Sequence, residues 1–207
     1  LEPLISANTI QDLTDWLTGT PFTEQPAAFF GWTVAEDESD PETKLVSINW
    51  ASLIMDDPEE YQEPSKIGTA KKEARTDLAR KMLVKLGYTD ESAAQTIEHC
   101  LAFEDTIAQD IPDSDYMDTD EFYNESTKHR IPEEIAELAG DFPLLSIIEG
   151  VYKVPPQDFY AVESPEFLRR LASLYNNDHI AELKDYLIVH SVITQSEFLD
   201  RECYEWH

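Results

Sequence analysis

The chain has 207 residues, of which 15 are Lys or Arg and 43 are Asp or Glu, so its formal net charge is −28. Proteins that bind nucleic-acid phosphates or an anionic membrane surface need a positively charged face, and this balance argues against both functions. Hydrophobic residues make up 42% of the sequence, which is enough to build a core and argues against disorder. With 6 glycines, the composition suits a helical protein better than a turn-rich β-sandwich.

The sequence gives no sign of a membrane segment or of a disulfide-rich scaffold. No apolar run approaches the ~20 residues that a transmembrane helix needs. The first residues, Leu1-Glu2-Pro3, contain neither an initiator Met nor the basic segment of a signal peptide, so we expect a piece of a longer protein. Cys100 and Cys203 are the two cysteines, and either one disulfide or two free thiols would be compatible with the sequence.

The first elements in chain order are a helix and a β-hairpin. Apolar residues at helical spacing predict a helix over Ser6–Leu17, which ends before Gly19. Between Ala28 and Trp50 the sequence becomes aromatic and β-branched, and the acidic segment Glu36–Glu42 divides this stretch in two. This pattern predicts a small hairpin with an acidic turn.

The clearest helix is predicted over Lys66–Leu86, with Gly87 at its C-terminal end. Its expected buried stripe repeats every fourth residue and consists of Ala70, Ala74, Leu78 and Met82. A second helix begins after Thr89-Asp90, and its expected inner face consists of Ala93, Ile97, Leu101, Glu104 and Ala108.

The remaining sequence predicts a linker followed by further helices. Asp110–Asp120 is acidic, contains Pro112 and is predicted to be the linker. Further helices are expected to start at Ile131-Pro132 and at Ser164-Pro165, because proline is tolerated in the first helical turn. Two more are expected, one with the stripe Ile180, Leu183 and Leu187, and a short one over Glu197–Tyr204. We therefore predict a mainly α fold with one β-hairpin, formed as a single domain over residues 1–207.

The histidines do not form a recognisable metal-binding motif. A zinc hydrolase commonly has His-Glu-x-x-His, and none of the five histidines, which are His99, His129, His179, His190 and His207, is followed by Glu or by a His four residues later. His99 and Cys100 are adjacent, so their side chains diverge on a helix, and we expect His99 and His190 to lie at helix boundaries between core and solvent. Cys203 and His207 have a spacing that could bind a metal, although the chain terminus is an improbable place for such a site. We therefore predict no metal ligands and no catalytic residues in this chain.

Two other charged segments have simpler interpretations. The run Asp113–Glu121 is similar to a calcium-binding loop, but Asp118 and Asn124 stand where such a loop needs Gly and Glu, so a solvated acidic loop is favoured. Seven of the 15 basic residues fall within Lys66–Lys85. They could dock an acidic partner, but the favoured interpretation is that they complement the acidic remainder of the same chain. No glycine-rich phosphate loop and no Gly-x-Ser-x-Gly motif is present.

A series of short motifs, in order, points to a known family. They are Phe29-Phe30, Asp37–Asp40, Leu45-x-x-Ile48 and Leu53; Tyr61 and the basic helix that closes on Leu86-Gly87; Glu104-x-x-Ile107-Ala108; Tyr123-Asn124 with Thr127; Leu183-Lys184-x-Tyr186-Leu187; and Leu199-Asp200. In this order the chain resembles part of the N-terminal helical region of the neprilysin family of zinc metalloendopeptidases, over roughly Ile10–Asp200. It departs from the family at Ile54-Met55, where Leu-Pro is frequent, and at the single Tyr61, where a Tyr pair is frequent.

The resemblance implies a role without catalysis for this region. In the family, the zinc ligands lie in the C-terminal half, and the N-terminal helices cover a closed chamber that admits only peptides. The resemblance therefore implies that the parent protein is a zinc enzyme that acts on short peptides. This chain would hold no zinc and would contact the catalytic domain of the same polypeptide as a lid. The alternative is a free-standing acidic helical module that binds a basic protein through its charge of −28.

Overall fold

The computed structural model describes residues 1–37 and 40–206 of the chain. The described α-helices are α1 (Glu2–Ser6), α2 (Ile10–Gly19), α3 (Lys66–Lys85), α4 (Asp90–Ala108), α5 (Ser114–Met117), α6 (Asp120–Ser126), α7 (Pro132–Ala139), α8 (Leu144–Ser146), α9 (Pro165–Leu174), α10 (Ile180–Leu199) and α11 (Arg201–Trp206). The strands are β1 (Gly31–Asp37), β2 (Asp40–Asn49) and β3 (Tyr160–Val162), and the 3₁₀ turns include η2 (Pro58–Tyr61). The prediction of a mainly α fold is confirmed.

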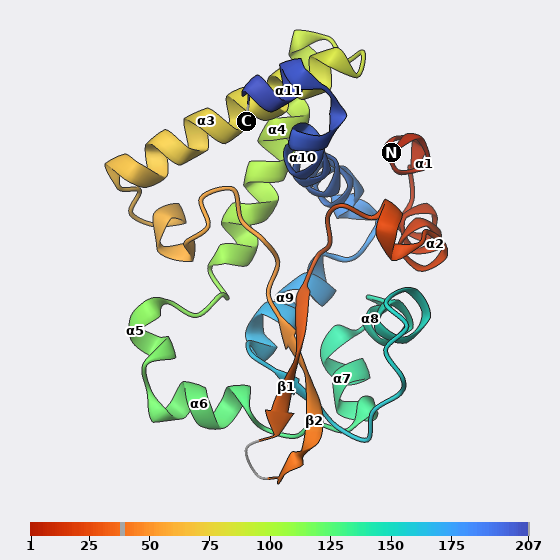
Figure 1. Cartoon of the computed structure of the whole chain (residues 1–207), viewed down its shortest axis with the longest axis vertical. Helices are drawn as coiled ribbons and strands as arrows, with labels where there is room; N and C mark the ends of the chain where they lie inside the picture. The colour runs from red at the N-terminus through yellow and green to blue at the C-terminus, as the bar shows by residue number, and fades with distance from the viewer. Residues whose placement is uncertain (38–39, 207) are drawn as a thin grey trace.

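The long helices gather at one end of the molecule. Figure 1 shows α3, α4, α10 and α11 together in the upper part of the view, near both chain ends. The small sheet lies below them, with α5 and α6 to one side and α7 and α8 to the other. None of the described helices combines the length and apolar character needed to cross a membrane.

The sheet has three strands in the order β1-β2-β3. Strands β1 and β2 form the predicted antiparallel hairpin, in which Gly31 pairs with Asn49. The predicted turn over Glu36–Glu42 is too long, because Glu36 still pairs with Lys44 and β2 already begins at Asp40; residues 38–39 lie outside the described part. Strand β3 pairs in parallel with β2 and was not predicted, since its three residues are too short for a recognisable alternation.

Hydrogen-bonding side chains cap the starts of α3 and α4. The Thr89 hydroxyl accepts a hydrogen bond from the backbone N–H of Ser92, and the Ser92 hydroxyl accepts one from Thr89, which forms a capping box before α4. Ser65 caps α3 by accepting from the backbone N–H of Gly68. At the end of α3, Gly87 has a φ of 99°, a left-handed conformation in which glycine avoids a steric penalty.

The expected stripe of α3 is buried only in its second half. Leu78 and Met82 are buried, whereas Ala70 and Ala74 are exposed. The physical reason is the position of the helix: in Figure 1 the first half of α3 projects away from α10 and α11, so nothing in the described chain covers its outer side. The spacing correctly predicted the helix but not the extent of its burial.

Three predicted boundaries are also wrong. The helix predicted over Ser6–Leu17 begins only at Ile10, because Thr9 caps it, and it includes Gly19. The expected linker Asp110–Asp120 contains the short helix α5, which Asp113 starts by accepting a hydrogen bond from the backbone N–H of Tyr116. The short helix expected over Glu197–Tyr204 does not exist as one element, because α10 continues to Leu199 and α11 begins at Arg201. The intervening Asp200 is extended and accepts a hydrogen bond from the Cys203 backbone N–H, so it ends one helix and caps the next.

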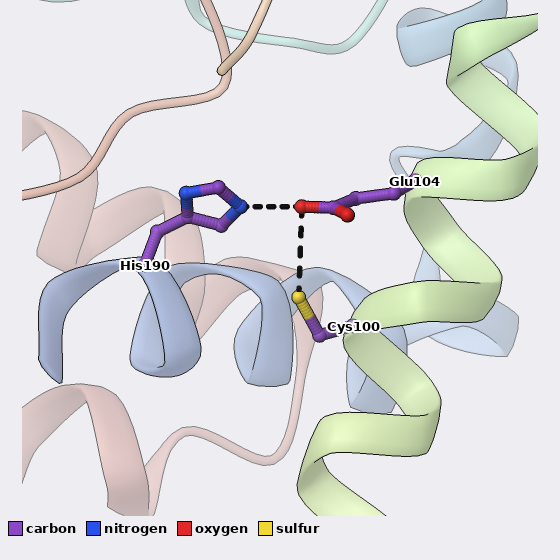
Figure 2. Close-up of side chains that lie close together, drawn as sticks. All are labelled: Cys100, Glu104 and His190. Carbon is purple, nitrogen blue, oxygen red and sulfur yellow. Dashed lines mark hydrogen bonds and ion pairs between the residues drawn. The ribbon is translucent and has the colours of Figure 1, made fainter. Parts of the chain in front are cut away.

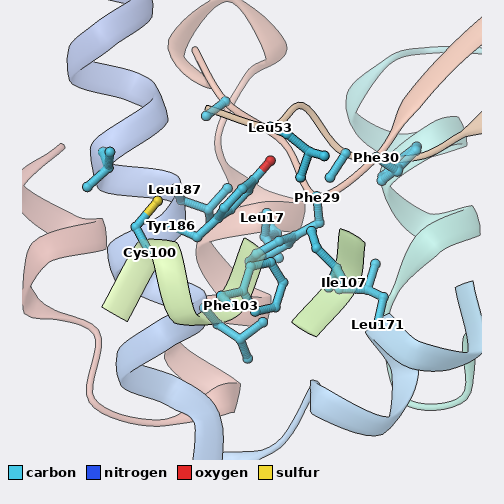
Figure 3. Close-up of a cluster of buried hydrophobic side chains, with 14 of the residues drawn as sticks. Leu17, Phe29, Phe30, Leu53, Cys100, Phe103, Ile107, Leu171, Tyr186 and Leu187 are labelled. Atoms are coloured by element: carbon cyan, nitrogen blue, oxygen red, sulfur yellow. The ribbon is translucent and has the colours of Figure 1, made fainter. Parts of the chain in front are cut away.

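The core centres on a group of aromatic rings. Phe29 is stacked on Tyr186 at 5.6 Å and meets Phe103 and Phe142 edge-on. Figure 3 shows that Phe29 comes from the segment before β1, Phe103 from α4 and Tyr186 from α10. Residues far apart in the sequence therefore share one packed cluster, which fixes the sheet against the α4–α10 pair.

Candidate functional site

The polar centre of the molecule lies between α4 and α10. His99 Nδ1 lies 2.7 Å from a carboxylate oxygen of Asp185, and His190 Nε2 lies 2.5 Å from Oε1 of Glu104. Both pairs join residues 86 positions apart and lie where α4 and α10 cross, as Figure 2 shows. The pairs are reversed, because α4 contributes the histidine to one pair and the carboxylate to the other.

Glu104 is the most completely buried charged residue of this centre, with an exposed fraction of 0%. Its carboxylate accepts hydrogen bonds from the backbone N–H of Ile54 at 3.1 and 3.2 Å and from the Tyr61 hydroxyl, in addition to its contact with His190. Figure 2 shows the Glu104 oxygen between the His190 ring and the Cys100 sulfur. A buried carboxylate is tolerated only when its oxygens are paired in this way. Glu104 therefore attaches the loop before α3 to the α4–α10 pair.

The neighbouring groups are held in their protonated forms. Burial, together with the negative charge of Glu104, raises the pKa of the Tyr61 hydroxyl far above its usual value. Burial also raises the pKa of the Cys100 thiol, and the charges of Glu104 and Asp185 act in the same direction. A cysteine nucleophile needs a lowered pKa, so Cys100 has the opposite character and acts as a weak donor to Glu104 at 3.9 Å.

Cys100, Glu104 and His190 are also the residues in the described chain that could hold a metal ion, because their ligand atoms lie within 4.8 Å of one another. Thiolate, imidazole and carboxylate are all zinc ligands. However, two ligand atoms of tetrahedral zinc stand about 3.3 Å apart, and the 2.5 Å between Nε2 of His190 and Oε1 of Glu104 is a hydrogen-bond distance. In this structure the cluster is arranged as a hydrogen-bonded node.

The structure places the predicted metal candidates differently from the sequence. His99 lies within α4 and His190 within α10, so the predicted position at helix boundaries is wrong. Both residues are half-buried, as expected for a position between core and solvent, and each pairs with a carboxylate. The sequence search missed Glu104 and Cys100 as partners of His190, although their i, i+4 spacing on one helix was a usable signal. Cys100 and Cys203 are both buried, free thiols. The partner considered for Cys203, His207, lies outside the described residues.

The acidic run does not form a calcium loop. Asp113 precedes α5, Asp118 follows it and Asp120 begins α6, so the carboxylates are distributed over two helices. His129, from the segment after α6, pairs with Asp37 of β1 at 2.9 Å and stacks on Phe159. Residues 113–121 are all exposed, in agreement with the favoured interpretation of a solvated acidic segment.

The basic residues of α3 largely pair within the chain, as the favoured interpretation expected. The ion pairs join Lys71 and Arg75 to Asp56, Arg80 to Asp77 and Asp90, Lys81 to Asp77, and Lys85 to Asp200 and Glu202. Asp56 has a φ of 67°, and it holds this left-handed conformation with two cations on its carboxylate. Five of the seven basic residues therefore already have acidic partners in the described chain.

A cavity of about 320 Å³ lies between the end of α4, helices α5 and α6, and the start of α9. Of the carboxylates that line it, Asp110 pairs with Arg170 and Glu166 pairs with Arg169. The half-buried Glu163 accepts a long hydrogen bond from the Ser47 hydroxyl at 3.4 Å. Burial accordingly raises the pKa of Glu163.

This raised pKa predicts a pH-dependent effect of Glu163→Gln. A carboxyl group with a raised pKa in the folded state stabilises the protein less as the pH rises through that pKa, because the unfolded chain accepts the charge more easily. At pH 7 the variant should therefore melt about 2 °C above the wild type, as measured by thermal unfolding. At pH 3, where the carboxyl group is protonated in both states, the two proteins should melt at the same temperature. The control, Glu166→Gln, removes an exposed paired carboxylate, and an equal gain in that variant would contradict the assignment.

With the geometry described, the comparisons with known proteins identify the family. A family model described as Peptidase family M13, and named for the N-terminal region, matches residues 3–207. The chain belongs to peptidase family M13. The resemblance to the neprilysin-like metallopeptidases is thereby confirmed. No curated protein matches this M13 chain by sequence.

Solved structures show the same fold as this M13 chain. PepO from Lactobacillus rhamnosis is 17% identical with a TM-score of 0.80, and it matches 97% of this chain and 31% of its own. The zinc metalloprotease Zmp1 from Mycobacterium tuberculosis in complex with an inhibitor is 17% identical with a TM-score of 0.82, over 99% of this chain and 31% of its own. Zmp1 from Mycobacterium tuberculosis in the open state is 16% identical with a TM-score of 0.80, over 99% of this chain and 31% of its own. The M13 chain therefore spans about a third of the length of these structures.

Proposed function

We propose that this chain is the non-catalytic lid region of a zinc metalloendopeptidase, forming a wall of the chamber that admits short peptides. The observation that carries the proposal is the match of the M13 N-terminal model over residues 3–207, while the chain spans 31% of each similar structure. Peptide hydrolysis and the exclusion of large substrates would then belong to different parts of one polypeptide.

The described side chains support this division. Zinc hydrolysis needs three protein ligands, an open coordination position for water and a base that takes the proton of that water. In residues 1–37 and 40–206, the group closest to this pattern is Cys100, Glu104 and His190. Glu104 already accepts hydrogen bonds from the Ile54 N–H and the Tyr61 hydroxyl, so it is not available as a base. We infer that the zinc ligands belong to the rest of the parent protein.

The buried node gives the proposed wall its rigidity. Glu104 joins α4 to α10 through His190 and to the loop before α3 through Ile54. Arg75 of α3 donates to the Ile54 carbonyl from the other side, so both polar groups of this residue are held. A wall that excludes large substrates must keep its shape, and a buried, fully paired network provides this property.

The proposal is tested on the full-length protein with one peptide sequence in two contexts. We expect cleavage of the free peptide and no cleavage of the same sequence within a stably folded protein. We also expect a chelator to abolish activity, and zinc to restore it, because hydrolysis would depend on the bound ion. Rapid cleavage of the folded substrate would contradict the lid function, and undiminished activity in chelator would contradict the zinc enzyme. A native reading frame that ends near residue 207 would favour the acidic interaction module instead.

A further inference from the structure

The outer edge of β1 is a row of backbone hydrogen-bonding groups with which no strand of the described chain pairs. In the sheet order β1-β2-β3, β1 is an end strand and its partner is β2. The middle of the strand is open to solvent, because Thr33 and Val34 are exposed on opposite faces and Glu36 is exposed beyond them. In Figure 1 the β1–β2 hairpin reaches the lower end of the molecule. An edge of this kind can accept one more strand.

The buried layer on one face of the sheet stops before it reaches this edge. Val34 and Val46 are paired across the two strands and therefore point to the same face. Val46 is 1% exposed, whereas Val34 is 54% exposed. Trp32 lies two residues before Val34, on the same face, and stacks on Tyr152 at 5.5 Å. A strand added to β1 would therefore cover Val34 with an apolar side chain of its own.

The free edge ends at an acidic hairpin turn. Residues 36–44 contain five Asp or Glu and one Lys, which gives this segment a formal charge of −4. The exposed ion pair between Glu36 and Lys44 leaves this excess in place, and so does the contact of His129 with Asp37. The whole chain carries −28, so a basic extended peptide is attracted to the edge, whereas a second copy of the chain is repelled.

We propose that β1 binds peptide substrates of the parent protein by strand addition, and that it prefers an extended segment with a basic residue two positions from an apolar one. The inference rests on the proposed function, because it takes the ligand to be a peptide that enters the chamber. Backbone groups of β1 hold the peptide main chain by hydrogen bonds, and these do not depend on sequence. The preference comes from Val34 and Glu36, which lie on one face, so the peptide residues opposite them are also two positions apart.

The first test measures binding of a short peptide to the full-length protein, which is kept in chelator so that the peptide is not cleaved. The peptide has a central Val and a Lys two positions to either side, so either strand direction places a Lys beside Glu36. Replacement of both Lys by Glu should weaken binding about 5-fold. Methylation of the amide nitrogens at alternate residues removes the N–H groups from one edge of the peptide. One of the two alternating patterns should abolish binding and the other preserve it, because a single edge of the peptide faces β1.

The second test changes the edge itself. Val34→Lys places a charge in the middle of the strand edge and should weaken binding of the basic peptide at least ~5-fold. Ile67→Lys on α3 is the matched control, because Ile67 is also an exposed apolar residue, at 70%, and the change of charge is the same. In the wild type, hydrogen exchange followed by mass spectrometry should show slower exchange of the β1 amides when the peptide is bound.

Three results would overturn the proposal. They are equal weakening by Val34→Lys and Ile67→Lys, unchanged binding of both N-methylated peptides, and protection of all the β1 amides in the full-length protein without peptide. If the peptide bound at β1 but was not cleaved after zinc was restored, the binding edge would stand and the peptidase function would be refuted. Cleavage of peptides with no difference between the two variants would refute the binding edge and leave the peptidase function in place.

Discussion

Replacement of Glu104 by Gln is expected to lower the free energy of unfolding by about 3 kcal/mol. The carboxylate accepts from the Ile54 N–H, the Tyr61 hydroxyl and His190 at once. A Gln amide has one acceptor oxygen and one NH₂ donor group, so at least one of these buried donors loses its acceptor or faces another donor. Urea denaturation followed by circular dichroism measures the change.

The control for this prediction is Glu98→Gln on the same helix. Glu98 is exposed, so its replacement should change the free energy of unfolding by less than about 0.5 kcal/mol. If both variants unfolded at the same urea concentration, the node at Glu104 would contribute no more than a surface residue. The structural role assigned to the buried carboxylate would then be wrong.

Replacement of Phe29 by Ala should cost about 3–5 kcal/mol of unfolding free energy, because it removes a large ring from the centre of the core. Phe29 contacts Phe103, Phe142 and Tyr186, and it is 1% exposed. These neighbours belong to separate elements, so their backbones cannot easily move together to fill the cavity.

Phe22→Ala provides a control with the same change of side chain. Phe22 is 56% exposed and meets the Tyr152 ring edge-on at 5.1 Å, so its loss should cost about 1 kcal/mol or less. Equal destabilisation of the two variants, measured by urea denaturation, would show that Phe29 does not occupy the centre of the core.

The local elements of this protein could be predicted from the sequence because their signals are local. Thr89 and Ser92 lie within one helical turn and start α4 where the sequence places it. The aromatic and β-branched runs around the acidic turn gave the β1–β2 hairpin. The series of motifs from Phe29-Phe30 to Leu199-Asp200 identified the family. Each of these signals depends on neighbouring residues or on their order, which the sequence states directly.

Tertiary structure alone decided which of these residues meet. From the sequence, Glu104 was one position on a helix face and His190 an isolated histidine. The packing of α4 against α10 brings the two side chains to 2.5 Å although they are 86 residues apart. Similarly, the repeat of Ala70, Ala74, Leu78 and Met82 predicts one continuous buried stripe, although α3 buries only the last two. The period of a helix determines which side chains share a face. Whether that face is covered depends on where other segments pack, and for α3 that information lies outside its own sequence.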